Sequence, residues 1–214
     1  ASPTLEPSIA TGRTTLRAMP YSEIGELLSR TEFDTAIFQT SLPDAQGRYS
    51  FAHSCDMPPV VWPNARTKIL FVNEQMRSLD HAEGIPSDAV DLAVPINEPL
   101  LSPAPSGPRS AAVDTIAKLV AGLVPDGATF QAGIGDTPAA VVSALRLHRG
   151  LKVHSGIITQ EYQQLAESGA LDAGVQHVAG IAWGDAAFRN WLPQSGFVFR
   201  SVVETHGHQE LAAI

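Results

Sequence analysis

Two glycines before a predicted helix form the strongest local signal for chemistry in this sequence. Gly133 and Gly135 separate a β-rich run from a helical pattern that carries Pro138 in its first turn. Glycines let the backbone approach a ligand closely, and free N–H groups at a helix N-terminus favour an anion or a developing oxyanion. The spacing lacks the third glycine of a dinucleotide fingerprint, and no Lys-Ser/Thr pair follows as in a P-loop. A tight turn without a ligand fits this pattern equally well.

A second polar cluster lies at the carboxyl end of the next predicted strand, residues 151–154, where open α/β sheets bind ligands. His154 and Ser155 resemble a base and a nucleophile, but adjacent residues of a strand point to opposite faces. We therefore expect no Ser-His pair and interpret His154 as a structural histidine. Glu161 falls in the first turn of the following helix, where a carboxylate interacts favourably with the helix dipole. That role is favoured over catalysis.

Two further histidines stand near the end of the sequence. His206 and His208 would lie on one side of an extended chain, but no Cys, Asp or third His stands nearby at ligand spacing. We therefore expect no metal site. The single cysteine, Cys55, is interpreted as a small buried residue.

The elements that position these residues alternate between helix and strand after residue 108. The apolar spacing predicts strands over 128–132, 151–154, 175–182 and 197–203, and helices over 109–124, 138–147, 159–168, 185–191 and from about 209. Strands that alternate with ten-residue helices imply βαβ units. The expected fold class is α/β, with open, mostly parallel sheets and flanking helices.

The sequence before residue 99 gives a mixed α/β pattern. It predicts a helix over 21–29 with Ser22 as the N-cap, and strands over 34–41, 49–54, 68–73 and 91–96. Residues 99–108 contain four prolines and predict an extended linker. We therefore expect residues 1–98 to form the C-terminal part of a first α/β half and residues 109–214 the first part of a second.

Composition excludes several classes of partner. The 214 residues are 44% hydrophobic and carry a net charge of −8, which argues against nucleic acid and anionic membranes as partners. No apolar run approaches the roughly 20 residues of a membrane span. A single cysteine fits a reducing compartment, so we predict a cytoplasmic protein. The absence of an initial Met and the apolar C-terminal run suggest a piece of something longer.

Eight segments in fixed order form a pattern that covers nearly the whole chain. They are SLPD (41–44), VNEQM (72–76), DGATFQAGIG (126–135), PAAV (138–141), HS (154–155), ESGAL (167–171), TH (205–206) and LAAI (211–214). In this set and order the chain resembles the acetyl-CoA hydrolase/CoA-transferase family.

The resemblance implies two similar α/β halves, joined by a Pro-rich connection, with acyl-CoA bound between them. In the family's transferases a glutamate carboxylate attacks the acyl-CoA thioester, and the resulting glutamyl-CoA thioester passes CoA to an acceptor carboxylate. By the same resemblance, the expected CoA or oxyanion contacts are Gln131, Gly133, Ile134, Gly135 and Ser155. Coenzyme A is then a substrate, and no tightly bound cofactor is expected.

The chain departs from the family at the nucleophile. The glutamate follows the His-Ser/Thr pair, and that position is Gly156 here, which cannot form a glutamyl thioester. The space left could admit water and favour thioester hydrolysis if another base existed. Glu161 is a poorly placed substitute, because the intervening turn and helix carry it away from Gly156.

The predicted function is therefore CoA-transferase or acyl-CoA hydrolase chemistry on short acyl-CoA thioesters such as acetyl-CoA, with a small carboxylate as acceptor. The alternative is a non-catalytic CoA-binding or assembly subunit. A sugar-phosphate isomerase ranks last, because Asp136 is the only nearby acid/base candidate beside the glycines. We expect a homo-oligomer, or a second chain that completes the fold.

Overall fold

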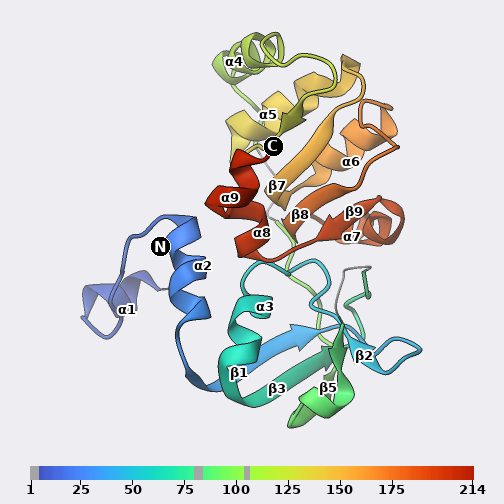
Figure 1. Ribbon diagram of the computed structural model, residues 1–214. Helices are drawn as coiled ribbons and strands as arrows, with labels where there is room; N and C mark the ends of the chain where they lie inside the picture. Colours follow the sequence, from blue (N-terminus) through green and yellow to red (C-terminus); the bar gives the residue numbers. More distant parts are fainter. Residues whose placement is uncertain (1–4, 80–83, 104–106) are drawn as a thin grey trace.

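The computed structural model describes residues 5–79, 84–103 and 107–214 (Figure 1). The first half of the chain builds a parallel sheet in the order β1–β3–β5, with strands β1 (Phe33–Thr40), β3 (Ala65–Asn73) and β5 (Leu92–Ile96). Strands β2 (Arg48–Tyr49) and β4 (Ile85–Pro86) form a short antiparallel ribbon. The helical segments are α1 (Glu6–Ala10), α2 (Tyr21–Ser29), α3 (Pro58–Val61), η1 (Trp62–Asn64) and η2 (Ser87–Ala89).

The second half builds a parallel sheet in the order β6–β7–β8–β9. Its strands are β6 (Thr129–Phe130), β7 (Lys152–Ile158), β8 (His177–Ala182) and β9 (Phe197–Phe199). The helical segments are α4 (Ala111–Ala121), α5 (Asp136–Ala144), η3 (Leu145–Leu147), α6 (Gln160–Glu167), α7 (Ala186–Trp191), η4 (Leu192–Gln194), α8 (Val202–His206) and α9 (His208–Ala212). The expected α/β class with mostly parallel sheets and flanking helices is confirmed.

The segment 53–56, which follows β2, joins the two halves. The Cys55 N–H donates to the Gly180 carbonyl of β8 at 3.0 Å, and the Val202 N–H of α8 donates to the Asp56 carbonyl at 2.7 Å. Buried apolar side chains of both halves form one hydrophobic core. Because hydrogen bonds and core fix the halves together, residues of the first half can line a site on the second sheet.

Most predicted elements are confirmed, and several of their boundaries are wrong. The strand expected over 197–203 ends at Phe199, because Ser201 and Glu204 form a capping box that starts α8. The strand expected over 49–54 stops after two residues, and the left-handed backbone of Ala52 (φ 51°) follows. Helix α2 begins one residue before Ser22, so its N-cap is Pro20.

Residues 99–103 and 107–108 of the predicted linker contain neither helix nor strand, and residues 104–106 lie outside the described residues. The division into domains at this linker stays a prediction. Within the described ranges, no helix is long and apolar enough to cross a lipid bilayer.

Candidate functional site

The glycine turn, residues 133–135, lies between β6 and α5. Gly135 is the N-cap of α5 with φ +122° and ψ 176°, a conformation that L side chains rarely adopt. The turn is exposed, and the side chain of Ile134 is 77% accessible. The N–H groups of Gly133, Ile134 and Gly135 donate no hydrogen bond within the described part of the chain. They are therefore free to bind an anion or a developing oxyanion.

A cavity of about 430 Å³, hereafter the α8 cavity, opens between this turn and helix α8. It is lined by Tyr21, Gln131, Ala132, Gly133, Ile134, Gly156, Ile157, Ile181 and His206. Figure 1 shows α8 beside α2, next to β7 and β8. The expected contacts Gln131, Gly133 and Ile134 thus share one cavity with Gly156, whereas Gly135 is absent from its lining.

The side of Gly156 where a side chain would project is filled by His206. A Cβ atom built on Gly156 would lie 2.0 Å from His206 Cε1 and 2.7 Å from Nε2. Because real Cβ atoms do not come this close to other heavy atoms, glycine is required at position 156 while the imidazole stays in place.

The imidazole of His206 is held by two neighbours. Its Nδ1 is hydrogen-bonded to Thr205 Oγ1 at 2.9 Å, and its ring packs on the Tyr21 ring with centroids 4.6 Å apart. Burial lowers the pKa of His206, the charge of His154 lowers it further, and Asp56 acts in the opposite direction. The ring is therefore mainly neutral at pH 7.

Tyr21 and Asp56 form a hydrogen-bonded pair next to the ring of His206. The Tyr21 hydroxyl donates to Asp56 Oδ2 at 2.5 Å, and Asp56 is 7% exposed. Burial raises the pKa of Tyr21, and the hydrogen bond and negative charge of Asp56 raise it further. Tyr21 therefore keeps its proton and acts as a hydrogen-bond donor.

Two expected site residues lie away from this cavity. Ser155 is fully buried and its hydroxyl donates to the Ile157 carbonyl at 2.8 Å. Glu161 accepts a hydrogen bond from Thr159 at 2.6 Å and pairs with Arg109 at 3.5 Å. Neither residue is among those that line the α8 cavity.

Sequence patterns do not reveal the grouping of Tyr21, Asp56 and His206, which are distant along the chain. From the sequence, His206 is a candidate only as a possible metal partner of His208. In the structure Gly207 separates α8 from α9, and His208 is exposed. No group of three potential metal ligands occurs among the described residues.

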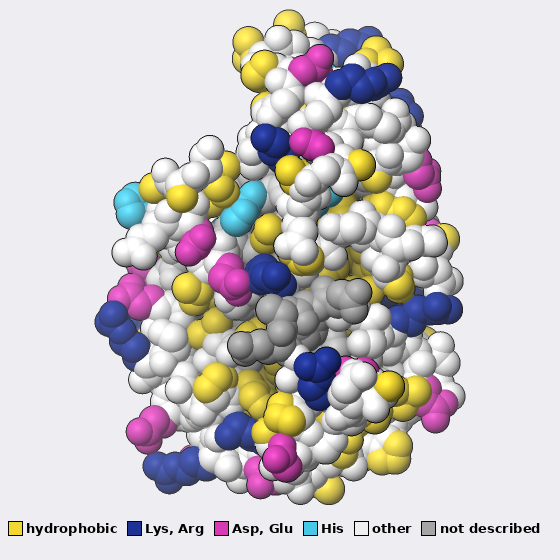
Figure 2. All heavy atoms as spheres, turned by 45° about the vertical axis from the view of Figure 1, so that its right-hand side comes forward, with side chains coloured by type: hydrophobic (Ala, Val, Ile, Leu, Met, Phe, Trp, Pro, Cys, Tyr) yellow, Lys and Arg dark blue, Asp and Glu magenta, His cyan; other side chains and the backbone are white. Residues whose placement is uncertain are grey.

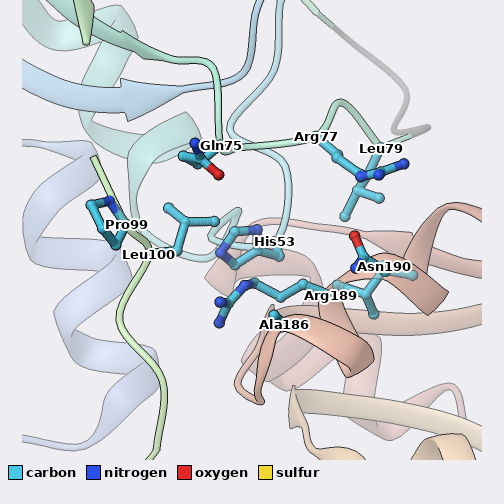
Figure 3. Close-up of a pocket in the computed structure, with 10 residues that line it drawn as sticks. His53, Gln75, Arg77, Leu79, Pro99, Leu100, Ala186, Arg189 and Asn190 are labelled. Atoms are coloured by element: carbon cyan, nitrogen blue, oxygen red, sulfur yellow. The ribbon is translucent and has the colours of Figure 1, made fainter. Parts of the chain in front are cut away.

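A second cavity, of about 300 Å³, lies between the two halves (Figure 3). His53 and Arg189 line it, and Arg189 donates to the carbonyls of Gly184 at 2.7 Å and Leu101 at 3.0 Å. Burial, with a smaller contribution from the charge of Arg189, lowers the pKa of His53 to about 4. Because the guanidinium of Arg189 donates to the Leu101 carbonyl, this side chain anchors the segment 99–103 to α7.

Comparison with known proteins relates the chain to CoA-transferases, although no family model matches it. It is 34% identical over 145 residues to the 4-hydroxybutyrate coenzyme A transferase of Clostridium kluyveri, covering 67% of this chain and 33% of that protein. It is 31% identical over 167 residues to the succinyl-CoA:acetate/propanoyl-CoA:succinate CoA transferase of Fasciola hepatica, covering 77% of this chain and 35% of that protein.

Solved structures share the fold. RipA from Yersinia pestis matches with a TM-score of 0.85 and 22% identity, over 97% of this chain and 51% of that one. The 4-hydroxybutyrate CoA-transferase of Porphyromonas gingivalis matches with a TM-score of 0.80 and 24% identity, over 94% of this chain and 53% of that one.

The fold is therefore that of part of a CoA-transferase-like α/β protein. The sequence relatives are 4-hydroxybutyrate and acetate CoA-transferases, so the resemblance to the CoA-transferase family is confirmed. The chain spans about one third of the length of these curated relatives.

Proposed function

We propose that the protein carrying this chain acts on short acyl-CoA thioesters such as acetyl-CoA, with CoA-transferase or acyl-CoA hydrolase chemistry, in the α8 cavity. The observation that carries the proposal is the exposed glycine turn, whose three N–H groups have no hydrogen-bond partner in the described part of the chain. Two of its residues, Gly133 and Ile134, line the cavity of about 430 Å³. The names of the curated relatives supply the substrate class: acyl-CoA and a small carboxylate.

The glycine turn would act on the carbonyl oxygen of the thioester. Negative charge develops on this oxygen when a nucleophile attacks the carbonyl carbon, and donors already in place stabilise it without reorganisation. One good oxyanion donor lowers the barrier by about 3 kcal/mol. The expected contacts Gln131, Gly133, Ile134, Gly135 and Ser155 stay part of this proposal, with the first three supported by the cavity lining.

With glycine at position 156, no glutamyl-CoA thioester can form at this position. Gly156 has no carboxylate, and the space beside it is occupied by the ring of His206. This observation also favours a second candidate function, a non-catalytic CoA-binding or assembly subunit. Coenzyme A is a substrate or ligand in both proposals, and neither includes a tightly bound cofactor.

We also propose that another copy of the chain, or a second chain, completes the site. Helix α4 exposes apolar side chains, including Leu119 at 68% and, just after its end, Leu123 at 83%. Hydrophobic side chains lie among charged ones at the top of Figure 2, where α4 lies. Large exposed apolar side chains that gather on one helix are typical of a protein–protein contact. A reducing location such as the cytoplasm is consistent with Cys55, which is free and buried.

The proposal is tested with CoA and acetyl-CoA on the protein expressed from its complete reading frame. Calorimetry measures binding, thiol release measures hydrolysis, and incorporation of labelled acetate into acetyl-CoA measures transfer. Gly133→Val adds bulk to the turn, and its Cβ meets only Pro138 Cγ at 3.9 Å, so the fold should survive while binding falls at least tenfold.

Gly107→Val is the matched control, because a Cβ at Gly107 meets nothing within 4 Å among the described residues. It should bind CoA as the unaltered protein does. Binding without either reaction supports the subunit function. Absence of CoA binding, or equal binding by Gly133→Val, contradicts the proposed site.

A further inference from the structure

We propose that His206 is the catalytic base of the α8 cavity and that water is the acyl acceptor, so that this site hydrolyses acyl-CoA. The inference rests on the proposed function, because it concerns the same cavity. It adds a residue for the proton transfer and a choice between water and carboxylate as acceptor.

The first support is the position of the imidazole. His206 and Gly156 both line the α8 cavity, together with the glycine turn. The ring reaches within 2.0 Å of the place where a Cβ of residue 156 would be. The group nearest to that side-chain position is therefore an imidazole from α8, and no carboxylate can occupy the same space.

The second support is the hydrogen bonding of the imidazole. The hydroxyl of Thr205 donates to the carbonyl of Ser201 at 3.2 Å, which uses its only proton. In this arrangement its oxygen accepts from Nδ1–H of His206 at 2.9 Å. We assign neutral His206 on this basis as the Nδ1–H tautomer, with the lone pair on Nε2. Nε2 makes no hydrogen bond within the described ranges and is free to bind water.

The third support is the set of ionisable groups around the ring. Helix α2 contributes Tyr21, the segment 53–56 contributes Asp56 and β7 contributes His154, while β8 contributes the apolar Ile181. Helix α9 carries the exposed His208.

These groups suit a base that is neutral before the reaction. Burial and His154 lower the pKa of His206, which leaves Nε2 unprotonated at neutral pH. Once Nε2 has taken a proton, the buried carboxylate of Asp56 stabilises the imidazolium. Tyr21 holds this carboxylate through its hydrogen bond and packs on the ring.

The reaction balances without another reactant. Nε2 takes a proton from water as the water oxygen forms a bond to the thioester carbonyl carbon, and the carbonyl oxygen becomes an oxyanion beside the glycine-turn N–H groups. Collapse of this intermediate breaks the C–S bond. The thiolate leaves and receives the proton from the imidazolium, giving a carboxylic acid and free coenzyme A.

The decisive comparison is His206→Gln against His208→Gln, with acetyl-CoA as the probe. Glutamine keeps a hydrogen-bonding side chain but is no base at neutral pH. We expect thiol release by His206→Gln to fall at least a hundredfold, whereas CoA binding by calorimetry and the thermal midpoint stay near those of the unaltered protein. His208→Gln, at an exposed neighbouring position, should keep full hydrolysis.

The pH profile gives a second readout, independent of folding. Thiol release by the unaltered protein should rise with pH along a limb whose apparent pKa lies below the ordinary 6.5 of histidine, and His206→Gln should lack this limb. Equal hydrolysis by His206→Gln overturns the assignment of the base. CoA binding with acetate exchange but without thiol release overturns water as the acceptor, while the proposed function stands. The proposed function itself is contradicted if the unaltered protein does not bind CoA.

Discussion

Gly156→Ala tests the central geometric claim, that the imidazole of His206 occupies the side-chain position of residue 156. The added Cβ would lie 2.0 Å from Cε1, and ordinary contact begins at 3.4 Å, so the ring must move by about 1.4 Å. Gly156 is not among the glycines with a positive φ, so the backbone itself accepts alanine. We expect the overpacking to cost about 1–3 kcal/mol of unfolding free energy.

The measurement is a double-mutant cycle in urea. His206→Ala removes the ring, so Gly156→Ala in that background should cost less than about 0.5 kcal/mol, giving a coupling energy of at least about 0.5 kcal/mol. Gly107→Ala is the control for the intrinsic effect of replacing glycine, because no described residue lies within 4 Å of its Cβ. Equal costs of Gly156→Ala in both backgrounds would refute the contact and, with it, the argument for a base beside Gly156.

Four further predictions test other parts of the structure. Gly135→Ala should cost about 1–3 kcal/mol in urea unfolding and weaken CoA binding in calorimetry, because alanine is strained at φ +122°. Glu161→Gln should leave thiol release within about twofold and cost at most about 1 kcal/mol, since this carboxylate pairs with Arg109 and lies outside the α8 cavity. Arg189→Gln should cost about 1–3 kcal/mol and speed hydrogen exchange in residues 99–103, because the guanidinium bonds to the Leu101 carbonyl would be lost. Burial lowers the pKa of His53 to about 4, so as the pH falls the unfolded protein binds a proton at this histidine before the folded protein does. The free energy of unfolding should therefore fall by about 3 kcal/mol at most between pH 6.5 and pH 4. His53→Gln should abolish this part of the pH dependence in urea titrations.

Local patterns were sufficient to predict most of the fold. The helix over 21–29 and the alternation of strands and helices after residue 108 follow from apolar spacing, which reports burial directly. The pattern failed where a cap outweighed β propensity. Val202 and Val203 favour a strand, but the capping box of Ser201 and Glu204 satisfies the N–H groups that start α8.

The candidate site was predictable only in part. The glycine turn was found because glycine spacing at a strand–helix junction is a local signal. The grouping of Tyr21, Asp56 and His206 depends on the hydrogen bonds between segment 53–56 and the second sheet and on the packing of α2 against α8. No periodicity within any one segment reports such contacts between distant segments.

The same contacts change the meaning of Gly156. In the sequence alone, the resemblance leads us to expect a glutamate where Gly156 stands, and this comparison indicates only that a carboxylate is missing. In the structure, the ring of His206 fills the space that a side chain at position 156 would need, so the glycine and the imidazole depend on each other. Gly156→Glu alone should therefore displace His206 without giving the carboxylate room. We expect a glutamyl thioester at this position to need Gly156→Glu together with a smaller residue at 206, because only the double substitution frees the space that the imidazole fills.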